Sequence, residues 1–226
     1  MKIKKMQFYI LMENILAISF TKASSMEMKN RALSLSNDRR LNSVNYGTFH
    51  SVFFRILRFF EKYELDCILD EKNKKFAIKG ILKNLNIENA EDEDTILGVI
   101  NEISYVKNEL MDKIDFDSEI LTSDEFCRVY NMYEEYKESI KKIDFDDMLI
   151  KTYNLLKQNK QILDRVRSVY RYILVDEFQD INKVQFEVIK LIASPNNNIF
   201  VVGDEDQSIY GFRGSRPDFL LEFEDY

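Results

Sequence analysis

The sequence predicts an α/β fold, in which helices surround a parallel β-sheet. Two short apolar runs, Tyr172–Val175 and Ile199–Val202, are rich in β-branched and aromatic residues and stop at acidic residues or glycine. Runs of this length and composition are typical of strands that a parallel sheet buries on both faces. Between them, apolar residues recur at helical spacing from Val184 to Ile192, so we expect this segment to fold as strand, helix, strand.

The N-terminal part of the chain is predicted to add a third strand and three helical segments. Residues 1–12 are expected to form the end of a helix. Ile15–Phe20 is a third apolar run with strand character, and a helix is expected to start at Thr21. A further apolar and basic helix is expected over Val52–Phe60, where Arg55 and Arg58 can either contact phosphates or simply complete an amphipathic surface.

The middle of the chain differs in character. Residues 61–140 are acidic and contain no apolar run of the buried-strand type. Two helical stripes are present, from Ile96 to Leu110 and from Phe126 to Ile140, and Thr122 with Glu125 has the spacing of a capping box before the second. We expect the tyrosines of the second stripe to pack in a core rather than to stack on bases. A short final helix is predicted at Asp218–Phe223, opened by Pro217.

Composition narrows the class of protein. The 226 residues are 45% apolar and 13% aromatic, which supports a folded core. The two cysteines, Cys67 and Cys127, are isolated and fit core thiols in a reducing compartment, and a single histidine argues against a zinc site. No apolar stretch approaches the length of a membrane span and no cleavage site follows the N-terminal lysines, so we expect a cytoplasmic protein without a membrane partner.

Charge is unevenly distributed along the chain. The net charge is −7, yet residues 1–60 contain ten Lys or Arg and three Asp or Glu, whereas the remaining 166 residues contain 22 and 36. A basic N-terminal section permits a phosphate-binding face despite the overall negative sign. A solvated basic helix explains the same counts, and the sequence leaves both interpretations open.

Chemistry is expected where the predicted strands end. Ligands of open α/β sheets bind beyond the carboxyl ends of the strands, and there the chain places Asp176, Glu177, Asp204 and Gln207. Magnesium usually takes one or two carboxylates plus water and phosphate oxygens. A neighbouring glutamate can act as a general base, an effect worth roughly 10²–10⁴-fold in rate. For Asp176 and Glu177 alone, an acidic surface turn is an equally good interpretation.

Two segments resemble motifs of a known family. Gly203–Gly214, with the sequence Gly-Asp-Glu-Asp-Gln-Ser-Ile-Tyr-Gly-Phe-Arg-Gly, resembles motif III of the UvrD/Rep family of superfamily 1 DNA helicases. Asp176–Asp180, with the sequence Asp-Glu-Phe-Gln-Asp, resembles motif II of that family, its Walker B element. The resemblance implies a RecA-like P-loop NTPase domain that uses ATP and Mg²⁺.

Residue roles follow from this resemblance. Asp176 is expected to bind Mg²⁺, Glu177 to be the general base for ATP hydrolysis, and Gln207 to contact the γ-phosphate. Tyr210 and Phe212 are expected to contact DNA, with the ring of Phe212 stacking on a base, a contact worth about 1–3 kcal/mol. Arg213 is expected to link the nucleotide site to the DNA site.

Two earlier segments resemble the DNA-contacting motifs of the same helicases. Ala17–Met28 partly resembles motif Ia, which implies DNA contacts from Thr21 and Lys22, although the basic residue lies one position early. Thr48-Phe49-His50-Ser51 resembles motif Ib, which implies DNA contacts from Thr48, Phe49 and His50.

A third resemblance defines the domain division. Asp144–Leu149 resembles the segment by which the family's chain returns to its first core domain, and we expect Asp147 and its neighbours to cap a helix. The implied division is a discontinuous RecA-like core of residues 1–60 and 141–226, with an all-helical insertion at 61–140.

One family element is missing from the sequence. The helicases need a Gly-x-x-x-x-Gly-Lys-Ser/Thr loop to hold the phosphates, and none of the six glycines here precedes Lys-Ser or Lys-Thr. We therefore expect an N-terminally truncated RecA-like domain with an exposed sheet edge and negligible ATP hydrolysis on its own.

Two functions remain open from the sequence. The first is part of an ATP-dependent 3′-to-5′ DNA helicase that acts on single-stranded DNA and duplex junctions in repair or recombination. The alternative is a non-catalytic single-stranded DNA-binding module, or one half of a split helicase or helicase–nuclease complex whose remainder is a separate chain.

Overall fold

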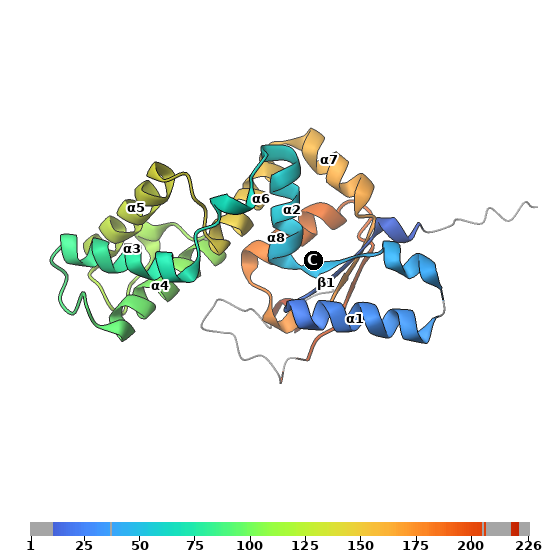
Figure 1. Cartoon of the computed structure of the whole chain (residues 1–226), viewed down its shortest axis with the longest axis horizontal. Coiled ribbons are helices and arrows are strands. Elements are labelled where there is room, and N and C mark those ends of the chain that lie inside the picture. Colours follow the sequence, from blue (N-terminus) through green and yellow to red (C-terminus); the bar gives the residue numbers. More distant parts are fainter. Residues whose placement is uncertain (1–10, 37, 205, 207–217, 222–226) are drawn as a thin grey trace, which may run out of the picture.

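The computed structural model describes residues 11–36, 38–204, 206 and 218–221. Within them, four strands form one parallel sheet in the order β2-β1-β3-β4 (Figure 1). The strands are β1 (Ile15–Ser19), β2 (Asn45–Thr48), β3 (Tyr172–Val175) and β4 (Ile199–Val201). The predicted α/β class and parallel sheet are confirmed. All four carboxyl ends therefore lie at one edge of the sheet.

Three of these strands were predicted from apolar runs, whereas β2 was not. Its sequence, Asn-Tyr-Gly-Thr, contains two residue types that are depleted in strands. Pairing with β1 forms it instead, with a register from Leu16 opposite Asn45 to Ser19 opposite Thr48. The side chain of Asn45 also donates a hydrogen bond of 2.8 Å to the carbonyl of Glu13, which fixes the start of the strand.

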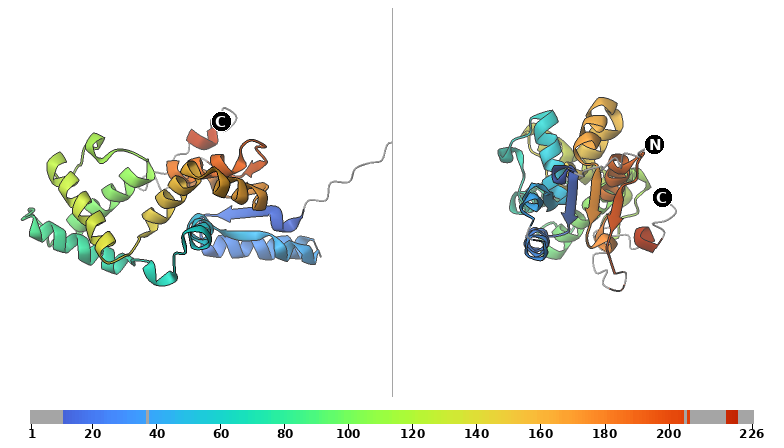
Figure 2. Two further views of the ribbon diagram at one scale, coloured as in Figure 1. Left: turned by 90° about the horizontal axis from the view of Figure 1, so that it is seen from above. Right: turned by 90° about the vertical axis from the view of Figure 1, so that its right-hand side faces the viewer.

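Helices cover the sheet unequally on its two faces. The α-helices are α1 (Lys22–Leu35), α2 (Phe49–Glu61), α3 (Glu71–Asn84), α4 (Glu93–Asn108), α5 (Ser123–Ser139), α6 (Phe145–Gln158), α7 (Lys160–Val169), α8 (Lys183–Ala193) and α9 (Asp218–Leu221). Side chains of α2, α6, α7 and α8 pack on Leu16, Ile18, Ile173 and Val175 in one hydrophobic cluster. Helix α1 lies on the other side, beside β1 and β2 (Figure 2).

The outer half of that second face is not covered by described residues. Leu174 and Phe200 are register partners on β3 and β4, and their side chains are 37% and 63% exposed. Strand β4 pairs only with β3 among the described residues, so its other edge is open. Parallel sheets usually bury both faces, which makes this exposed apolar surface unusual.

Helices α3, α4 and α5 form a separate group with its own hydrophobic cluster, which extends away from the sheet (Figure 1). The predicted stripes largely face this core: Ile96, Ile103, Phe126, Val129 and Tyr133 are all buried. Tyr130 and Tyr136 pack against it, as expected for core tyrosines.

The two predicted stripes are each slightly too long. Leu110 lies beyond α4 with a φ of 52°, and Ile140 is the residue that caps the end of α5. Two predicted helix starts agree with the structure, since Thr122 forms a capping box with Glu125 and Asp144 forms one with Asp147. The division of the chain into a core of residues 1–60 and 141–226 and an insertion of 61–140 stays a prediction.

A buried network of charges joins the helical group to the start of α6. Lys74 of α3 lies 2.8 Å from Asp146, Lys107 of α4 lies 2.7 Å from Asp147, and Lys137 of α5 lies 2.5 Å from Asp147. Burial alone would raise the pKa of Asp144, yet the ammonium groups of Lys107, Lys74 and Lys137 hold it far below its usual range. The aspartates predicted as helix caps therefore also anchor the three lysines.

No described helix combines the length and apolar character that spanning a bilayer requires.

Candidate functional site

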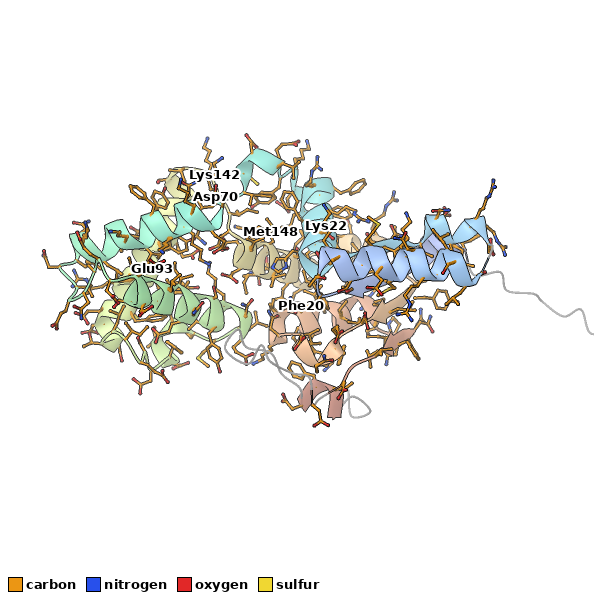
Figure 3. All side chains as sticks on the ribbon, turned by 60° about the horizontal axis from the view of Figure 1, so that its bottom comes forward. Phe20, Lys22, Asp70, Glu93, Lys142 and Met148 are labelled. Carbon is orange, nitrogen blue, oxygen red and sulfur yellow. The ribbon has the colours of Figure 1, made fainter. Side chains whose placement is uncertain are left out.

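Four segments meet at the carboxyl edge of the sheet. Phe20–Lys22 follow β1, Thr48–His50 include the end of β2, Asp176–Glu177 follow β3, and Gly203–Asp204 follow β4. Phe20 and Lys22 lie where this edge approaches the helical group (Figure 3). Backbone hydrogen bonds extend the pairing past the strands, since Asp176 N–H donates to Ile18 and Phe178 N–H donates to Val202, each at 2.9 Å.

The two predicted acids lie side by side at the end of β3. Glu177 has a φ of 55°, in the left-handed region that non-glycine residues rarely adopt. Such a conformation costs on the order of 1–2 kcal/mol, and residues held this way cluster at functional sites. Burial raises the pKa of Asp176 above its usual value, and the negative charge of Glu177 raises it further.

This pair fits the requirements of Mg²⁺. A half-buried carboxylate with a raised pKa beside a second carboxylate is a place where a cation relieves charge repulsion. Among the described side chains, no group of three or more His, Cys, Asp or Glu residues is arranged to hold a metal ion. Magnesium does not need such a group when phosphate oxygens and water complete its coordination.

Gln179 connects the ends of β3 and β4, a role that the sequence analysis missed. Its side chain is buried, donates a hydrogen bond of 2.7 Å to the carboxylate of Glu177, and accepts one of 3.1 Å from the backbone N–H of Asp204. Gly203 makes this approach possible, because a Cβ atom there would lie 2.6 Å from the Gln179 amide oxygen. The buried amide thus orients Glu177 and ties it to the loop that follows β4.

A cavity of about 450 Å³ lies between the sheet edge and helices α3 and α4. Phe20, His50 and Phe145 contribute aromatic rings to it, and the rings of His50 and Phe145 meet edge to face at 5.7 Å. Asn108 and Asp180 also line the cavity, and one buried oxygen of each side chain, Oδ1, has no hydrogen-bond partner among the described atoms. The lining also includes Glu71, Lys74 and Asp146, so the cavity combines aromatic rings with polar and charged groups. Such a lining suits a flat ligand that carries hydrogen-bonding groups.

Neither Phe20 nor Asn108 was predicted as a site residue. Phe20 is the last residue of an apolar run, so its sequence position indicated only a strand. Asn108 comes from α4, and no sequence pattern relates α4 to the end of β1. Burial also affects Asp180, whose pKa is raised by desolvation and by the charge of Glu177.

The predicted DNA-contacting residues occupy the starts of two helices. Thr21 caps α1 by accepting a hydrogen bond of 3.0 Å from Ser24 N–H, and Thr48 caps α2 in a reciprocal pair with Ser51. Lys22 is exposed and His50 lines the cavity. Phe49 is 2% exposed and packs edge to face on Phe53, so its ring supports the turn from inside the core.

The remaining predicted site residues, Gln207, Tyr210, Phe212 and Arg213, lie outside the described residues.

Comparison with known proteins decides the family. Residues 2–226 match the model of the UvrD/REP helicase N-terminal domain. The chain belongs to this helicase family. The resemblance of the strand-end segments to UvrD/REP motifs is therefore a resemblance within the chain's own family.

Several curated relatives of this UvrD/REP chain are named as DNA helicases. The chain is 36% identical over 217 residues to a probable DNA helicase II homolog of Mycoplasma capricolum, covering 92% of this chain and 30% of that protein. It is 38% identical to the ATP-dependent DNA helicase PcrA of Staphylococcus aureus, with coverage of 93% and 29%. It is 35% identical to the putative ATP-dependent DNA helicase YjcD of Bacillus subtilis, with coverage of 94% and 28%. The chain spans about 30% of the length of these relatives.

Proposed function

We propose that this chain is part of an ATP-dependent DNA helicase that moves 3′ to 5′ on single-stranded DNA and unwinds duplex junctions in repair or recombination. One observation carries the proposal: a single sheet edge holds both a paired-carboxylate centre, Asp176 with Glu177, and an aromatic cavity at Phe20 and His50. Hydrolysis and strand binding can be coupled where the two sites share a rigid sheet. The names of the relatives support the same activity.

Asp176 and Glu177 have different proposed roles in ATP hydrolysis. Bound Mg²⁺ supplies neutralisation of phosphate charge. The Asp176 carboxylate contributes a ligand of the type that Mg²⁺ takes from proteins. Glu177 accepts the proton of the attacking water, and the hydrogen bond from Gln179 holds its carboxylate in one orientation. Gln207 and Arg213 are proposed to contact the nucleotide.

The DNA strand is proposed to cross the ends of β1 and β2. The proposed phosphate contacts come from Lys22 and from the capped helix starts at Thr21 and Thr48. The buried ring of Phe49 holds the start of α2 in place. A base enters the cavity beside Phe20 and His50, where Asn108 is a polar neighbour. Tyr210 and Phe212 are proposed to stack on neighbouring bases.

The chain alone is proposed to hydrolyse ATP negligibly, because it contains no Gly-x-x-x-x-Gly-Lys-Ser/Thr loop to hold the phosphates. The test is the ATP turnover of the 226 residues with and without single-stranded DNA, beside Glu177→Gln. We expect the two proteins to show the same background rate. DNA-stimulated turnover that disappears in Glu177→Gln would overturn this part of the proposal.

A second candidate function is a non-catalytic module that binds single-stranded DNA, or one half of a split helicase. No described residue covers the face at Leu174 and Phe200 or pairs with the outer edge of β4, and this surface supports a split helicase whose other half is a separate chain. The response to nucleotide separates a non-catalytic module from a helicase part. A module binds DNA with the same affinity with or without Mg²⁺ and ATP. A helicase part, including one half of a split helicase mixed with its other half, changes its DNA affinity when Mg²⁺ and ATP are added.

A further inference from the structure

A groove of about 430 Å³ runs between α1, β2 and the first turns of α2. Three cationic side chains line it, from Lys22, Lys29 and Arg55, and none of its lining residues is acidic. Ser25 and Tyr46 add hydroxyl groups, whereas the hydroxyl of Ser51 donates to the carbonyl of Thr48 at 2.9 Å. The groove is therefore a positive surface with hydrogen-bond donors, in a chain whose net charge is −7.

The three cations are not neutralised within the described part of the chain. No described carboxylate forms an ion pair with Lys22, Lys29 or Arg55, and the guanidinium of Arg55 donates only to the neutral amide oxygen of Asn45, at 3.3 Å. The structure thereby separates two arginines that the sequence left equivalent. Arg55 points into the groove, whereas Arg58 lies 3.6 Å from the carboxylate of Glu64.

The groove is extended and begins at the proposed DNA site. Lys22 and Lys29 lie two helical turns apart on α1, a rise of about 10 Å along its axis. Lys22 and Thr48 line the groove, while Phe20 and His50, two residues away along the same two segments, line the aromatic cavity. A ligand that enters one of these hollows at the strand ends is therefore adjacent to the other.

We infer that this groove binds the sugar–phosphate backbone of the DNA strand whose base enters the cavity, with Lys29, Arg55 and Tyr46 as contacts beyond the sheet edge. The inference rests on the proposed function and extends it. A row of unpaired cations with hydroxyl donors matches a polyanion that presents phosphates in series. The absence of acidic lining residues removes the repulsion that the rest of this acidic chain would impose.

The test measures how binding depends on salt. A fluorescently labelled single-stranded oligothymidylate is titrated with the chain by anisotropy at several salt concentrations, for wild type and for Lys29→Ala/Arg55→Ala. Each phosphate contact to a single strand contributes about −0.7 to the slope of log K against log salt, so the double variant should have a slope smaller by about 1.4. The double variant Lys29→Arg/Arg55→Lys keeps both charges and should retain the wild-type slope.

The matched control is Arg31→Ala/Arg58→Ala, which removes two cations from the same two helices outside the groove. Arg31 lies 3.8 Å from Glu27 and Arg58 3.6 Å from Glu64, so neither is expected to bind phosphate, and the slope should stay at the wild-type value. One contrary result is a slope that falls equally in Lys29→Ala/Arg55→Ala and in Arg31→Ala/Arg58→Ala, and another is a slope that does not fall in Lys29→Ala/Arg55→Ala. Either result would overturn DNA binding in the groove and leave the proposed binding at the cavity intact. Failure of the wild-type chain to bind the oligonucleotide would overturn the groove and the proposed DNA site together.

Discussion

The amide oxygen of Gln179, four residues past β3, accepts a hydrogen bond of 3.1 Å from the backbone N–H of Asp204, just past β4. The same side chain donates to Glu177. One buried amide therefore fixes both the proposed general base and the start of the segment that precedes Gln207, Tyr210 and Phe212. A substitution at the end of β4 should therefore change the orientation of the Glu177 carboxylate through this bridge.

Gly203→Ala is expected to break this bridge. The new Cβ would lie 2.6 Å from the Gln179 amide oxygen and 3.2 Å from its backbone nitrogen, so the buried side chain must move and lose a partner. We expect a loss of about 1–3 kcal/mol in the free energy of unfolding, measured by urea denaturation. Gly80→Ala is the control, since nothing lies within 4 Å of its new Cβ in helix α3, and it should gain about 0.5–1 kcal/mol. Equal stability of Gly203→Ala and wild type would contradict the bridge.

Lys74→Met is expected to destabilise the junction between the helical group and α6. It leaves the buried Asp146 carboxylate without its ammonium partner, and breaking a buried pair costs about 3–5 kcal/mol. Ser104 still donates to Asp146 at 2.6 Å, which favours the lower end of that range. Lys72→Met, an exposed neighbour on the same helix, should change the free energy of unfolding by less than about 0.5 kcal/mol. Adding Asp146→Asn to Lys74→Met should recover part of the loss, and two independent, additive effects would argue against the pair.

Asp176→Asn is expected to stabilise the chain at neutral pH. Burial and Glu177 raise the pKa of Asp176 in the folded state, so the folded protein holds this proton more tightly than the unfolded chain does. Stability from this group is therefore present at low pH and is lost as pH rises from its ordinary value of about 3.9 through the raised folded pKa. The advantage of Asp176→Asn should grow over that window and be constant above it, as measured by denaturation at a series of pH values. A variant that is less stable than wild type at neutral pH would contradict the assigned charge repulsion.

Phe200→Lys is expected to reduce self-association. Its ring is 63% exposed on the outermost strand, beside an edge that has no described partner, and charged residues on edge strands oppose edge-to-edge pairing. Sedimentation velocity at rising protein concentration should show a smaller associated fraction for this variant. Phe76→Lys provides a matched change at a ring that is 76% exposed on α3. Association that falls equally in both variants would show that the strand edge is not the contact.

Sequence patterns predicted the strands whose own residues favour a buried strand. The apolar runs at β1, β3 and β4 are buried by helices on at least one face, so their composition indicates their structure. Strand β2 forms because it pairs with β1, and its residues Asn45 and Gly47 do not favour a strand. The aspartates at the start of α6 were predicted as caps, but the lysines that they bind come from three other helices.

The same distinction holds for the site. Asp176 and Glu177 were predicted because they follow an apolar run, and the parallel sheet brings that run's end to the functional edge. Gln179 and Asn108 were missed because their contacts depend on β4 and on the docking of α4, neither of which a local pattern encodes. Phe49 illustrates the reverse case, since a motif position that implies DNA contact holds a ring that lies inside the core.

The most direct test of the account is the affinity of the chain for a labelled single-stranded oligothymidylate, compared between wild type, Phe20→Ala and Phe76→Ala. Stacking on an aromatic side chain is worth about 1–3 kcal/mol per base, so Phe20→Ala should weaken binding by about tenfold, while Phe76→Ala should match wild type. The wild-type chain should also prefer the single strand to a blunt duplex of the same length. Equal affinity of Phe20→Ala and wild type, or no preference for the single strand, would contradict the placement of DNA at this edge of the sheet.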